Sequence, residues 1–357
     1  MLQRLNVAGV RNLQACTLSF SRLNLFYGLN GSGKSSLLEA VHLLALGRSF
    51  RSQHIRKIIQ DGQTSCTVFA RLASGQQLGI KKDVEGGQLL KRNASVVNSM
   101  AEFAYDLPVQ LIHPESMELI DAGSKPRRQL LDWLVFHVEP SFYSVWQRYQ
   151  RALLQRNALL KKPQTDEAEW AVWEQELAQH AVHLHMMRER VMQDWLKFVQ
   201  NAMGLLLPSL MLAVDYVPGF DVEKDFALQL QEARQKDVVR GYTQMGAHRA
   251  DLRLKSDLGL AEAVLSRGQK KLLVCALKLA QVEFLKAQGK TCVVLLDDLA
   301  SELDVLARAR LLGCLQQLQA QVLITAVEAE SVWPLLHELD SHAKLFHVEQ
   351  GCITPEF

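Results

Sequence analysis

A glycine-rich octapeptide near the start of the chain carries the residue types that bind nucleotide phosphates. Residues 28–35 read Gly-Leu-Asn-Gly-Ser-Gly-Lys-Ser and fit the pattern G-x-x-x-x-G-K-[ST]. In this pattern Lys34 reaches the β- and γ-phosphates, and the Ser35 hydroxyl ligates Mg²⁺. A Gly/Ser turn before a helix is the alternative interpretation. The expected phosphate-binding residues are Gly28, Leu29, Asn30, Gly31, Ser32, Gly33, Lys34, Ser35 and Ser36.

Two carboxylates follow an apolar segment far along the chain. Residues 292–296 read Cys-Val-Val-Leu-Leu and precede Asp297 and Asp298. A buried strand that ends in an acid can place that acid beside the phosphate loop, where it holds the hydrated Mg²⁺. We assign this metal role to Asp297 together with Ser35, and expect Asp298 to orient or deprotonate the attacking water. An acid after an apolar strand is common in loops, so the assignment depends on the phosphate loop.

A third group of residues opens a long predicted helix. Residues 265–269 read Leu-Ser-Arg-Gly-Gln, and an amphipathic helix is expected from 270 to 287. Ser266 and the amide of Gly268 stand where an anion binds at the start of a helix. A serine that only caps the helix is the structural alternative. Residues 301–304, Ser-Glu-Leu-Asp, could by themselves form a similar helix start.

The segments around these residues predict an α/β protein. Strands are expected at 2–7, 15–20, 23–27, 66–72 and 77–81, with a helix at 36–44 and turns at Gly75, Gly86 and Gly87. Further strands are expected near 213–217 and 248–255. The last hundred residues alternate a helix, a strand at 292–296, a helix at 305–319 and a strand at 321–326. This alternation is typical of a sheet with parallel strands.

Two long helices are predicted in the middle of the chain. Apolar and aromatic residues from Phe142 to Leu160 are spaced alternately by four and three, and residues from Trp170 to Phe198 recur every seven. Pro163 separates the two runs, and Thr165 or Asp166 is a possible N-cap. We expect an antiparallel helical hairpin whose second helix, at 1.5 Å per residue, is roughly 57 Å long. The aromatic stripe is interpreted as a packing seam and not as a cofactor site.

The composition sets wider limits. The 357 residues favour two or three domains, and 48% hydrophobic residues support a packed core. A net charge of +2 neither indicates nor excludes a nucleic-acid partner. Six cysteines without a CxxC pair are expected to be reduced, mostly in the core of a cytoplasmic protein. No signal peptide and no membrane span are expected.

The order of these motifs resembles the ABC-type ATPases, and more narrowly the RecF family, which is related to the SMC and Rad50 heads. The resemblance covers essentially the whole chain. Val10 and the block His113-Pro114-Glu115-Ser116 depart from the family pattern, which leaves the γ-phosphate-sensing residue open between Gln110 and His113. The switch residue, His in transporters, would be Thr325 or a neighbour. The blocks that carry the likeness are Arg11-Asn12, residues 30–40, Gly47 to Arg51, Pro126 to Arg128 with Leu131-Asp132, Gly246 to Asp251, and Leu296 to Asp304.

The resemblance implies a fold as well. It implies an α/β ABC-ATPase head, with a mixed sheet that carries the phosphate loop, and an inserted helical lobe with a short antiparallel hairpin. Lobe I would contain residues 1–110 and 245–357, and lobe II residues 111–244. Too few residues separate Lys34 from Ser266 for a long SMC-type coiled coil.

The resemblance also implies a mechanism. Its site residues would be Lys34, Asp297, Asp298 and Ser266 for catalysis, with Gly268 and Gln269 beside the phosphates and ATP and Mg²⁺ as cofactors. In such ATPases the signature Ser and Gly contact the γ-phosphate that a second subunit holds. One phosphate loop and one signature per chain therefore imply an ATP-dependent homodimer.

The function implied by the family is ATP-dependent DNA binding in recombinational repair and replication restart. The chain would bind single-stranded, gapped and double-stranded DNA, help RecR- and RecO-type partners load the recombinase, and be linked to SOS induction. Its ATPase would be weak, DNA-stimulated and used as a switch. Candidate DNA contacts are the basic clusters at 48–57 and 125–128, although solvated faces are equally expected. Arg48 and Arg51 could equally reach the nucleotide or close a lobe interface. The alternatives are the ATPase subunit of an ABC transporter and a structural SMC-like head.

Overall fold

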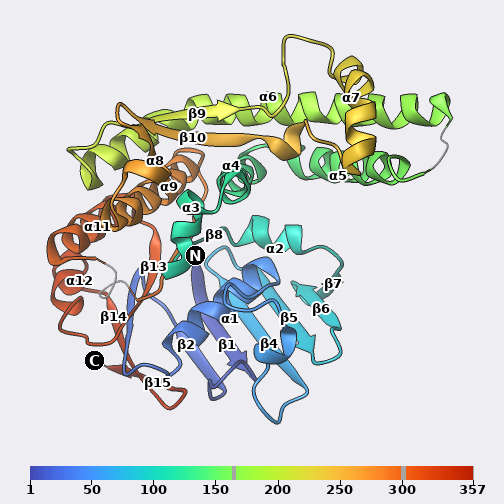
Figure 1. The fold of residues 1–357 in the computed structure, drawn as a ribbon. Coiled ribbons are helices and arrows are strands. Elements are labelled where there is room, and N and C mark those ends of the chain that lie inside the picture. Colours follow the sequence, from blue (N-terminus) through green and yellow to red (C-terminus); the bar gives the residue numbers. More distant parts are fainter. Residues whose placement is uncertain (163–165, 299–302, 357) are drawn as a thin grey trace. The chain divides into compact units, whose positions relative to one another are not determined.

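A computed structural model describes residues 1–162, 166–298 and 303–356 of the chain (Figure 1). It contains two compact units. The first unit contains Met1–Ser116, Leu205–Leu207 and Lys271–Phe357, and the second contains Met117–Gly204 and Pro208–Lys270. These units differ from the expected lobes at residues 111–116, 205–207 and 245–270. The lobes are defined by the resemblance to the ABC-type ATPases, whereas the two units are defined by the compactness of the chain. The lobe assignment therefore stays a prediction.

An antiparallel sheet begins the first unit. Its strand order is β2-β1-β4-β5-β6-β7, and every neighbouring pair is antiparallel. Apolar and polar residues alternate along its strands, so that Cys66, Val68, Ala70 and Leu72 of β4 are buried on one face. The strands are β1 (Leu2–Ala8), β2 (Cys16–Ser19), β4 (Ser65–Leu72), β5 (Gln77–Asp83), β6 (Gln88–Arg92) and β7 (Ser95–Val97).

A mixed sheet forms the other half of the first unit. Its order is β15-β14-β3-β13-β12-β8, with every pair parallel except β14 and β15. The central strands are apolar and buried throughout, as expected for parallel strands that are covered on both faces. The strands are β3 (Leu23–Tyr27), β8 (Val109–Ile112), β12 (Val293–Leu296), β13 (Gln321–Ala326), β14 (Lys344–Glu349) and β15 (Cys352–Glu356).

Helix α1 (Lys34–Leu46) packs against both sheets of the first unit (Figure 1). It is buried almost all round, because one side contacts the antiparallel sheet and the other the mixed sheet. Gly47 ends the helix in the left-handed region at φ 67°. The other elements of this unit are η1 (Ile55–Lys57), α2 (Met100–Asp106), most of α9 (Arg267–Ala287), α11 (Val305–Leu318) and α12 (Trp333–Leu339).

The second unit contains the helical hairpin. Its helices α5 (Phe142–Leu159) and α6 (Glu167–Leu206) correspond to the two predicted runs, and α6 has 40 residues. The heptad positions Leu177, Leu184 and Val191 are buried, which confirms the packing seam. The remaining elements are α3 (Glu118–Asp121), α4 (Ser124–Val138), α7 (Phe226–Arg240), η3 (Ala247–Arg249) and α8 (Ala261–Val264), and a sheet of β9 (Ala213–Val217), β10 (Asp251–Ser256) and β11 (Gly259–Leu260); η2 (Pro114–Met117) links the two units along the chain.

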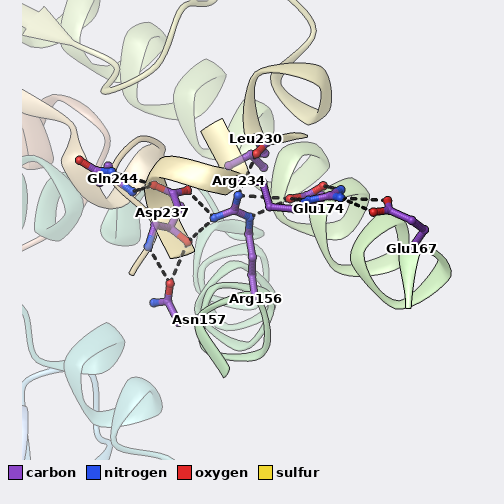
Figure 2. A network of polar contacts seen from close by, with 9 residues as sticks. Arg156, Asn157, Glu167, Glu174, Leu230, Arg234, Asp237 and Gln244 are labelled. Atoms are coloured by element: carbon purple, nitrogen blue, oxygen red, sulfur yellow. Dashed lines mark hydrogen bonds and ion pairs between the residues drawn. The ribbon is translucent and has the colours of Figure 1, made fainter. Parts of the chain in front are cut away.

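A buried arginine connects three helices of the second unit (Figure 2). Arg156 of α5 is fully buried and donates to Glu174 of α6, at 3.2 Å, and to Asp237 of α7, at 2.7 Å. Arg234 of α7 donates to both Glu174 and the exposed Glu167. Arg156 occupies a position that the sequence pattern assigned to the apolar stripe. Its charge is tolerated there because carboxylates and a carbonyl accept its hydrogen bonds.

The expected fold class is confirmed: an α/β head with a mixed sheet and a helical insertion is what the chain forms. The strands β6, β7, β8, β11, β14 and β15 were not expected from the sequence, and the 3₁₀ helix η3 (Ala247–Arg249) precedes β10, so that His248 and Arg249 do not belong to the strand. The expected Ser301-Glu302 helix start lies outside the described residues. In the part of the chain that the structure describes, no helix has both the length and the apolar character that a membrane span requires.

Candidate nucleotide site

The phosphate loop joins the buried strand β3 to helix α1, as the sequence predicted. Gly28, Gly31 and Gly33 have φ angles of 153°, 82° and 119°, which L side chains rarely adopt. A Cβ atom on Gly28 would also stand 2.1 Å from the carbonyl oxygen of Val348. Glycine is therefore required at residue 28 both by its backbone angle and by the close approach of β14.

Neighbouring segments fix the shape of the loop. Asn12 Nδ2 donates to the Gly31 carbonyl at 2.8 Å, and Ser36 Oγ donates to Asn12 Oδ1 at 3.0 Å. The amide of Gly351, in the turn between β14 and β15, donates to the Ser32 carbonyl at 2.8 Å. Asn12 thus holds the loop to the start of α1. The sequence had singled out Asn12 only as part of a family block.

Lys34 lies at the start of α1 with its ammonium turned back over the loop. Its Nζ atom donates to the carbonyl oxygens of Gly28 at 2.6 Å and Leu29 at 3.0 Å. Burial lowers the pKa of Lys34, and the carboxylates of Asp298 and Asp297 oppose that shift. Phosphate oxygens that enter the loop would compete with the two carbonyls for this ammonium.

The two acids lie at the carboxyl end of β12, in reach of the phosphate loop. Asp297 Oδ1 accepts hydrogen bonds from Ser35 Oγ and from Thr325 Oγ1, both at 2.8 Å. Thr325 Oγ1 also accepts from the Asp298 amide at 2.8 Å. Strand β13, which carries Thr325, pairs with both β3 and β12, so the strand order brings these residues together. Ser35 and Asp297, predicted from segments far apart in the sequence, are in direct contact.

Their oxygen atoms fit a magnesium site. Mg²⁺ prefers one or two protein oxygens with phosphate and water oxygens as its other ligands. The Ser35 hydroxyl and the Asp297 carboxylate supply two such oxygens 2.8 Å apart, next to the phosphate loop. A bound Mg²⁺ would neutralise charge that develops on the phosphates during transfer.

A cavity of about 840 Å³ opens around the loop within the first unit. Gly31, Gly33, Lys34, Ser35, Asp298 and Thr325 line it, together with the basic side chains of Arg11, Arg51, Arg56 and Lys57. Three of these four cations come from the 48–57 cluster that the sequence offered as a DNA contact. They line the nucleotide cavity, where positive charge favours phosphates, and a DNA contact by this cluster stays a prediction.

Arg11 is held in this wall by a buried acid of α1. Its Nε and Nη2 atoms donate to the two carboxylate oxygens of Glu39, both at 2.8 Å, and Glu39 is fully buried. Ser49 donates to the same carboxylate. The bidentate pair fixes a guanidinium at the cavity although its own φ of 50° is unusual for a residue other than glycine. The motif pattern alone gave no sign of Arg11 in the site.

The signature residues lie in the second unit, at the N-terminus of α9. Ser266 Oγ accepts from the Gln269 amide at 3.3 Å, and Gln269 Oε1 accepts from the Ser266 amide at 2.9 Å. This reciprocal pair is a capping box, so the structural alternative for Ser266 is realised in the structure. Ser266 and Gly268 are exposed, and a Cβ on Gly268 would meet no heavy atom within 4 Å. The helix start is thus open to a ligand, and its contact with a γ-phosphate stays a prediction.

Neither candidate for the γ-phosphate sensor lines the cavity. Gln110 is buried in β8 and donates to Gln281 of α9 at 2.7 Å. The ring of His113 lies 5.3 Å from the ring of Phe50, and burial lowers the pKa of His113 to about 4. Gln110 therefore packs in the interior of the first unit, whereas the partly buried His113 lies beside Phe50.

The second basic cluster has structural partners. Arg127 forms a bidentate ion pair with Asp251, at 2.8 and 2.9 Å, and Arg128 donates to the Ala250 carbonyl at 3.0 Å. These contacts hold the Arg127 guanidinium and one nitrogen of Arg128 within the second unit, and a DNA contact by this cluster stays a prediction. His248, whose role the sequence left open, packs against Tyr149, whose hydroxyl lies 2.6 Å from Nδ1.

Comparisons with known proteins agree with the site and the fold. The family model described as the RecF/RecN/SMC N terminal domain matches residues 1–354. The chain is 47% identical over 355 residues to "DNA replication and repair protein RecF" of Acinetobacter baumannii (strain SDF), covering 99% of this chain and 98% of that protein. It is 48% identical over 352 residues to the protein of the same name from Acinetobacter baylyi (strain ATCC 33305 / BD413 / ADP1), covering 98% of each.

Solved structures extend the likeness to the fold. "Structure of the recombination mediator protein RecF-ATP in RecFOR pathway" superposes with a TM-score of 0.86 at 25% identity, covering 100% of this chain and 97% of that one. A crystal structure of an SMC head bound to the C-winged helix domain of ScpA has a TM-score of 0.61 at 12% identity, covering 99% and 96% of the two chains, which shows a shared fold alone. With a family model and relatives that span nearly its full length, the chain belongs to the RecF family of DNA replication and repair proteins.

Proposed function

We propose that this chain is an ATP-dependent switch that binds DNA in recombinational repair and replication restart. The observation that carries the proposal is the hydrogen-bonded set of Ser35, Asp297 and Thr325, which joins the phosphate loop to the acidic strand end. Family membership supports the repair function, and a likeness to an ATP complex supports ATP as the nucleotide.

Each side chain has a distinct task in hydrolysis. Lys34 and the loop amides bind the β- and γ-phosphates, and the Arg11 guanidinium adds positive charge to the same cavity. Asp298 accepts a proton from the water that attacks the γ-phosphorus, while the bond to the β–γ bridging oxygen breaks and ADP leaves. Ser35 and Asp297 would hold Mg²⁺. Among the described residues that line the cavity, the other carboxylate is that of Asp61.

The site is completed by a second copy of the chain. The phosphate loop and the signature lie in different compact units, and the signature helix start is exposed. Ser266 donates to the γ-phosphate that the partner subunit holds, and Gly268 and Gln269 let the helix N-terminus approach it closely. ATP thus joins two copies, and hydrolysis releases them. In this scheme lobe I is formed by residues 1–110 and 245–357, and lobe II by 111–244.

The switch controls DNA binding and partner recruitment. Single-stranded, gapped and double-stranded DNA are the proposed ligands, with RecO- and RecR-type proteins as partners in loading the recombinase and SOS induction as a consequence. The ATPase is slow and DNA-stimulated, and the protein acts in the cytoplasm. The proposal draws on the family and on a neighbour whose description places it in the RecFOR pathway. No comparison supports the alternative of a transporter subunit.

Replacement of the loop lysine tests the proposal. Lys34→Met removes the ammonium that faces the phosphates, so we expect ATP binding to fall below detection, and ATP-dependent dimerisation and DNA binding to be lost with it. Lys161→Met makes the same exchange at an exposed lysine of the second unit and is the matched control. Binding of a fluorescent ATP analogue and anisotropy of labelled DNA give the two readouts. Normal ATP-dependent DNA binding by Lys34→Met would refute the proposal.

A further inference from the structure

The outward face of the antiparallel sheet carries four exposed cations from four strands. Arg4 lies on β1, Arg71 on β4, Lys81 on β5 and Lys91 on β6. The opposite face of the same strands is buried against α1, with Leu5, Val68 and Ile80 in the core. The pleat therefore directs the four charged side chains away from the core and onto one solvent-facing surface.

The strand register places these cations close together. Arg4 of β1 stands directly opposite Arg71 of β4. On β5, Gly79 stands between Phe69 of β4 and Lys91 of β6 and pairs with both. Lys81 is two residues further along β5 from Gly79, opposite Thr67. With strands about 4.8 Å apart and about 3.4 Å per residue, the four positions span roughly 15 Å across and 14 Å along the sheet. That patch matches the scale of several phosphates, which follow one another about every 3.4 Å along each strand of a duplex.

This surface is positive because acidic side chains do not pair with its cations. Within the described residues, none of the four cations has an ion pair or a side-chain hydrogen bond, whereas the neighbouring Arg92 pairs with Asp106 at 2.6 Å. Asp83 occupies the next outward position of β5, but its carboxylate accepts from the Glu85 and Gly87 amides of the turn. The patch is thus locally positive on a chain whose net charge is only +2.

The placement of these like charges on neighbouring strands is unfavourable for the stability of the sheet. Like charges directly opposite each other on neighbouring strands are destabilising, and Arg4 and Arg71 are such a pair. Gly79 has no side chain of its own at the centre of the patch, where Phe69 and Lys91 are its neighbours. A positive surface of this extent is suited to a large polyanion.

We propose that this face binds the sugar–phosphate backbone of duplex DNA through Arg4, Arg71, Lys81 and Lys91. The inference rests on the proposed function, since it gives the DNA ligand its contact surface. It adds a surface to the two basic clusters that the sequence offered, in which Arg51, Arg56 and Lys57 line the nucleotide cavity and Arg127 pairs with Asp251. Contacts to phosphates do not distinguish one base from another, so DNA binding by this face is independent of base sequence. Its affinity falls steeply as the salt concentration rises.

Charge-neutral variants test the surface. Lys81→Gln/Lys91→Gln removes two cations that neutralise phosphates, so we expect the affinity for a fluorescein-labelled 30-bp duplex, with ATP, to fall about tenfold. The slope of log K against log salt should become shallower by about 0.9 for each phosphate that is no longer neutralised. Lys236→Gln/Arg240→Gln removes the same charge from the exposed face of α7 in the second unit and should leave affinity and slope unchanged. ATP binding is measured on every variant and should not change.

A stability readout separates this role from a structural one. Arg71→Thr relieves the repulsion with Arg4 and introduces a residue that favours strands, so its melting temperature should rise while its DNA affinity falls. If the wild type binds the duplex and the Lys81/Lys91 variant binds equally well, or the α7 control loses as much affinity, the surface is wrong and the proposed function stands. If the wild type with ATP binds no DNA, the proposed function itself fails.

Discussion

Thr325 is the residue on which the geometry of both acids depends. Its hydroxyl donates to Asp297 and accepts from the Asp298 amide, each at 2.8 Å. Asp298 has a φ of 56°, a strained angle for a residue with a side chain, and the hydrogen bond to Thr325 helps to hold that turn. One hydroxyl therefore fixes the metal carboxylate and the backbone of the proposed base together.

Removal of that hydroxyl should slow hydrolysis more than it weakens binding. Thr325→Val keeps the shape of the side chain but leaves the Asp298 amide without its acceptor, so we expect the hydrolysis rate to fall at least about tenfold. ATP affinity should change little, because Lys34 and the loop amides are untouched. Steady-state phosphate release and nucleotide binding are the measurements. Thr325→Ser should restore most of the rate, and equal rates in the valine variant and the wild type would contradict this role.

At the scale of elements, the Arg156 network joins the end of α5 to α6 and α7 (Figure 2). Arg156 and its partner Asp237 are both fully buried, so neither charge has water to replace its partner. Removal of one member of such a pair leaves an uncompensated buried charge, which typically costs about 3–5 kcal/mol. The helical hairpin is thus held at its tip by a polar network and along its length by an apolar seam.

The arginine network predicts a large stability loss on a single substitution. Arg156→Met should lower the free energy of unfolding of the second unit by about 3 kcal/mol, because Asp237 and Glu174 lose their shared cation. Lys162→Met breaks the exposed pair with Glu169 and should cost less than about 1 kcal/mol. Urea unfolding followed by tryptophan fluorescence reports this unit, which contains every tryptophan but Trp333. Equal losses in the two variants would contradict the buried network.

The contact between α5 and η3 predicts a pH dependence. Burial lowers the pKa of His248 to about 4. The hydrogen bond to the Thr243 carbonyl opposes this shift, whereas the charges of Arg249 and Arg128 lower the pKa further. Between pH 6.5 and pH 4 the unfolded chain binds a proton at His248 that the folded chain does not, so stability falls as pH falls through this window. Tryptophan-detected unfolding of His248→Gln should depend less on pH there than that of the wild type. If the free energies of unfolding of the variant and the wild type changed with pH in parallel, the lowered pKa of His248 would be contradicted.

Periodic patterns predicted the elements well where one face is buried. The heptad positions of α6 and the alternation in β4 follow directly from contact with a core, and both were readable from the sequence. Strands β14 and β15 were missed, because Lys344 to Glu356 mixes polar and apolar residues with a Pro and carries no clean period. The burial of Arg156 shows a second limit of prediction from periodic patterns. It depends on the ion pair with Asp237, which is distant in the sequence, so the spacing of residues within the helix could not predict it.

The sequence predicted those residues of the candidate site that belong to its motifs. Ser35 and Asp297 were paired from chemistry alone, and their contact is observed. The family resemblance singled out Arg11, Asn12 and Thr325, but their hydrogen-bond partners lie on other elements and could be identified only in the structure. Arg51 was expected to reach either DNA or the nucleotide, whereas Arg56 and Lys57 were counted only in the basic cluster; the structure places all three on the lining of the cavity.

For the whole molecule, the central claim is that the nucleotide site is shared between two copies. The first unit supplies the phosphate loop, the acids and the cavity, and the second unit supplies an exposed helix start with the signature. The reciprocal hydrogen bonds between Ser266 and Gln269 give that exposed helix start a defined conformation. ATP held by one copy would then meet the signature of the other.

Light scattering of Ser266→Arg with ATP tests this claim most directly. The arginine adds bulk and charge at the proposed interface but lies in the other unit from the phosphate loop, so ATP binding should stay at the wild-type level. We predict that ATP converts the wild type to a dimer and leaves the variant a monomer, with Lys197→Arg, on α6, as a control that dimerises normally. A Ser266→Arg protein that dimerises with ATP as the wild type does would contradict the shared site.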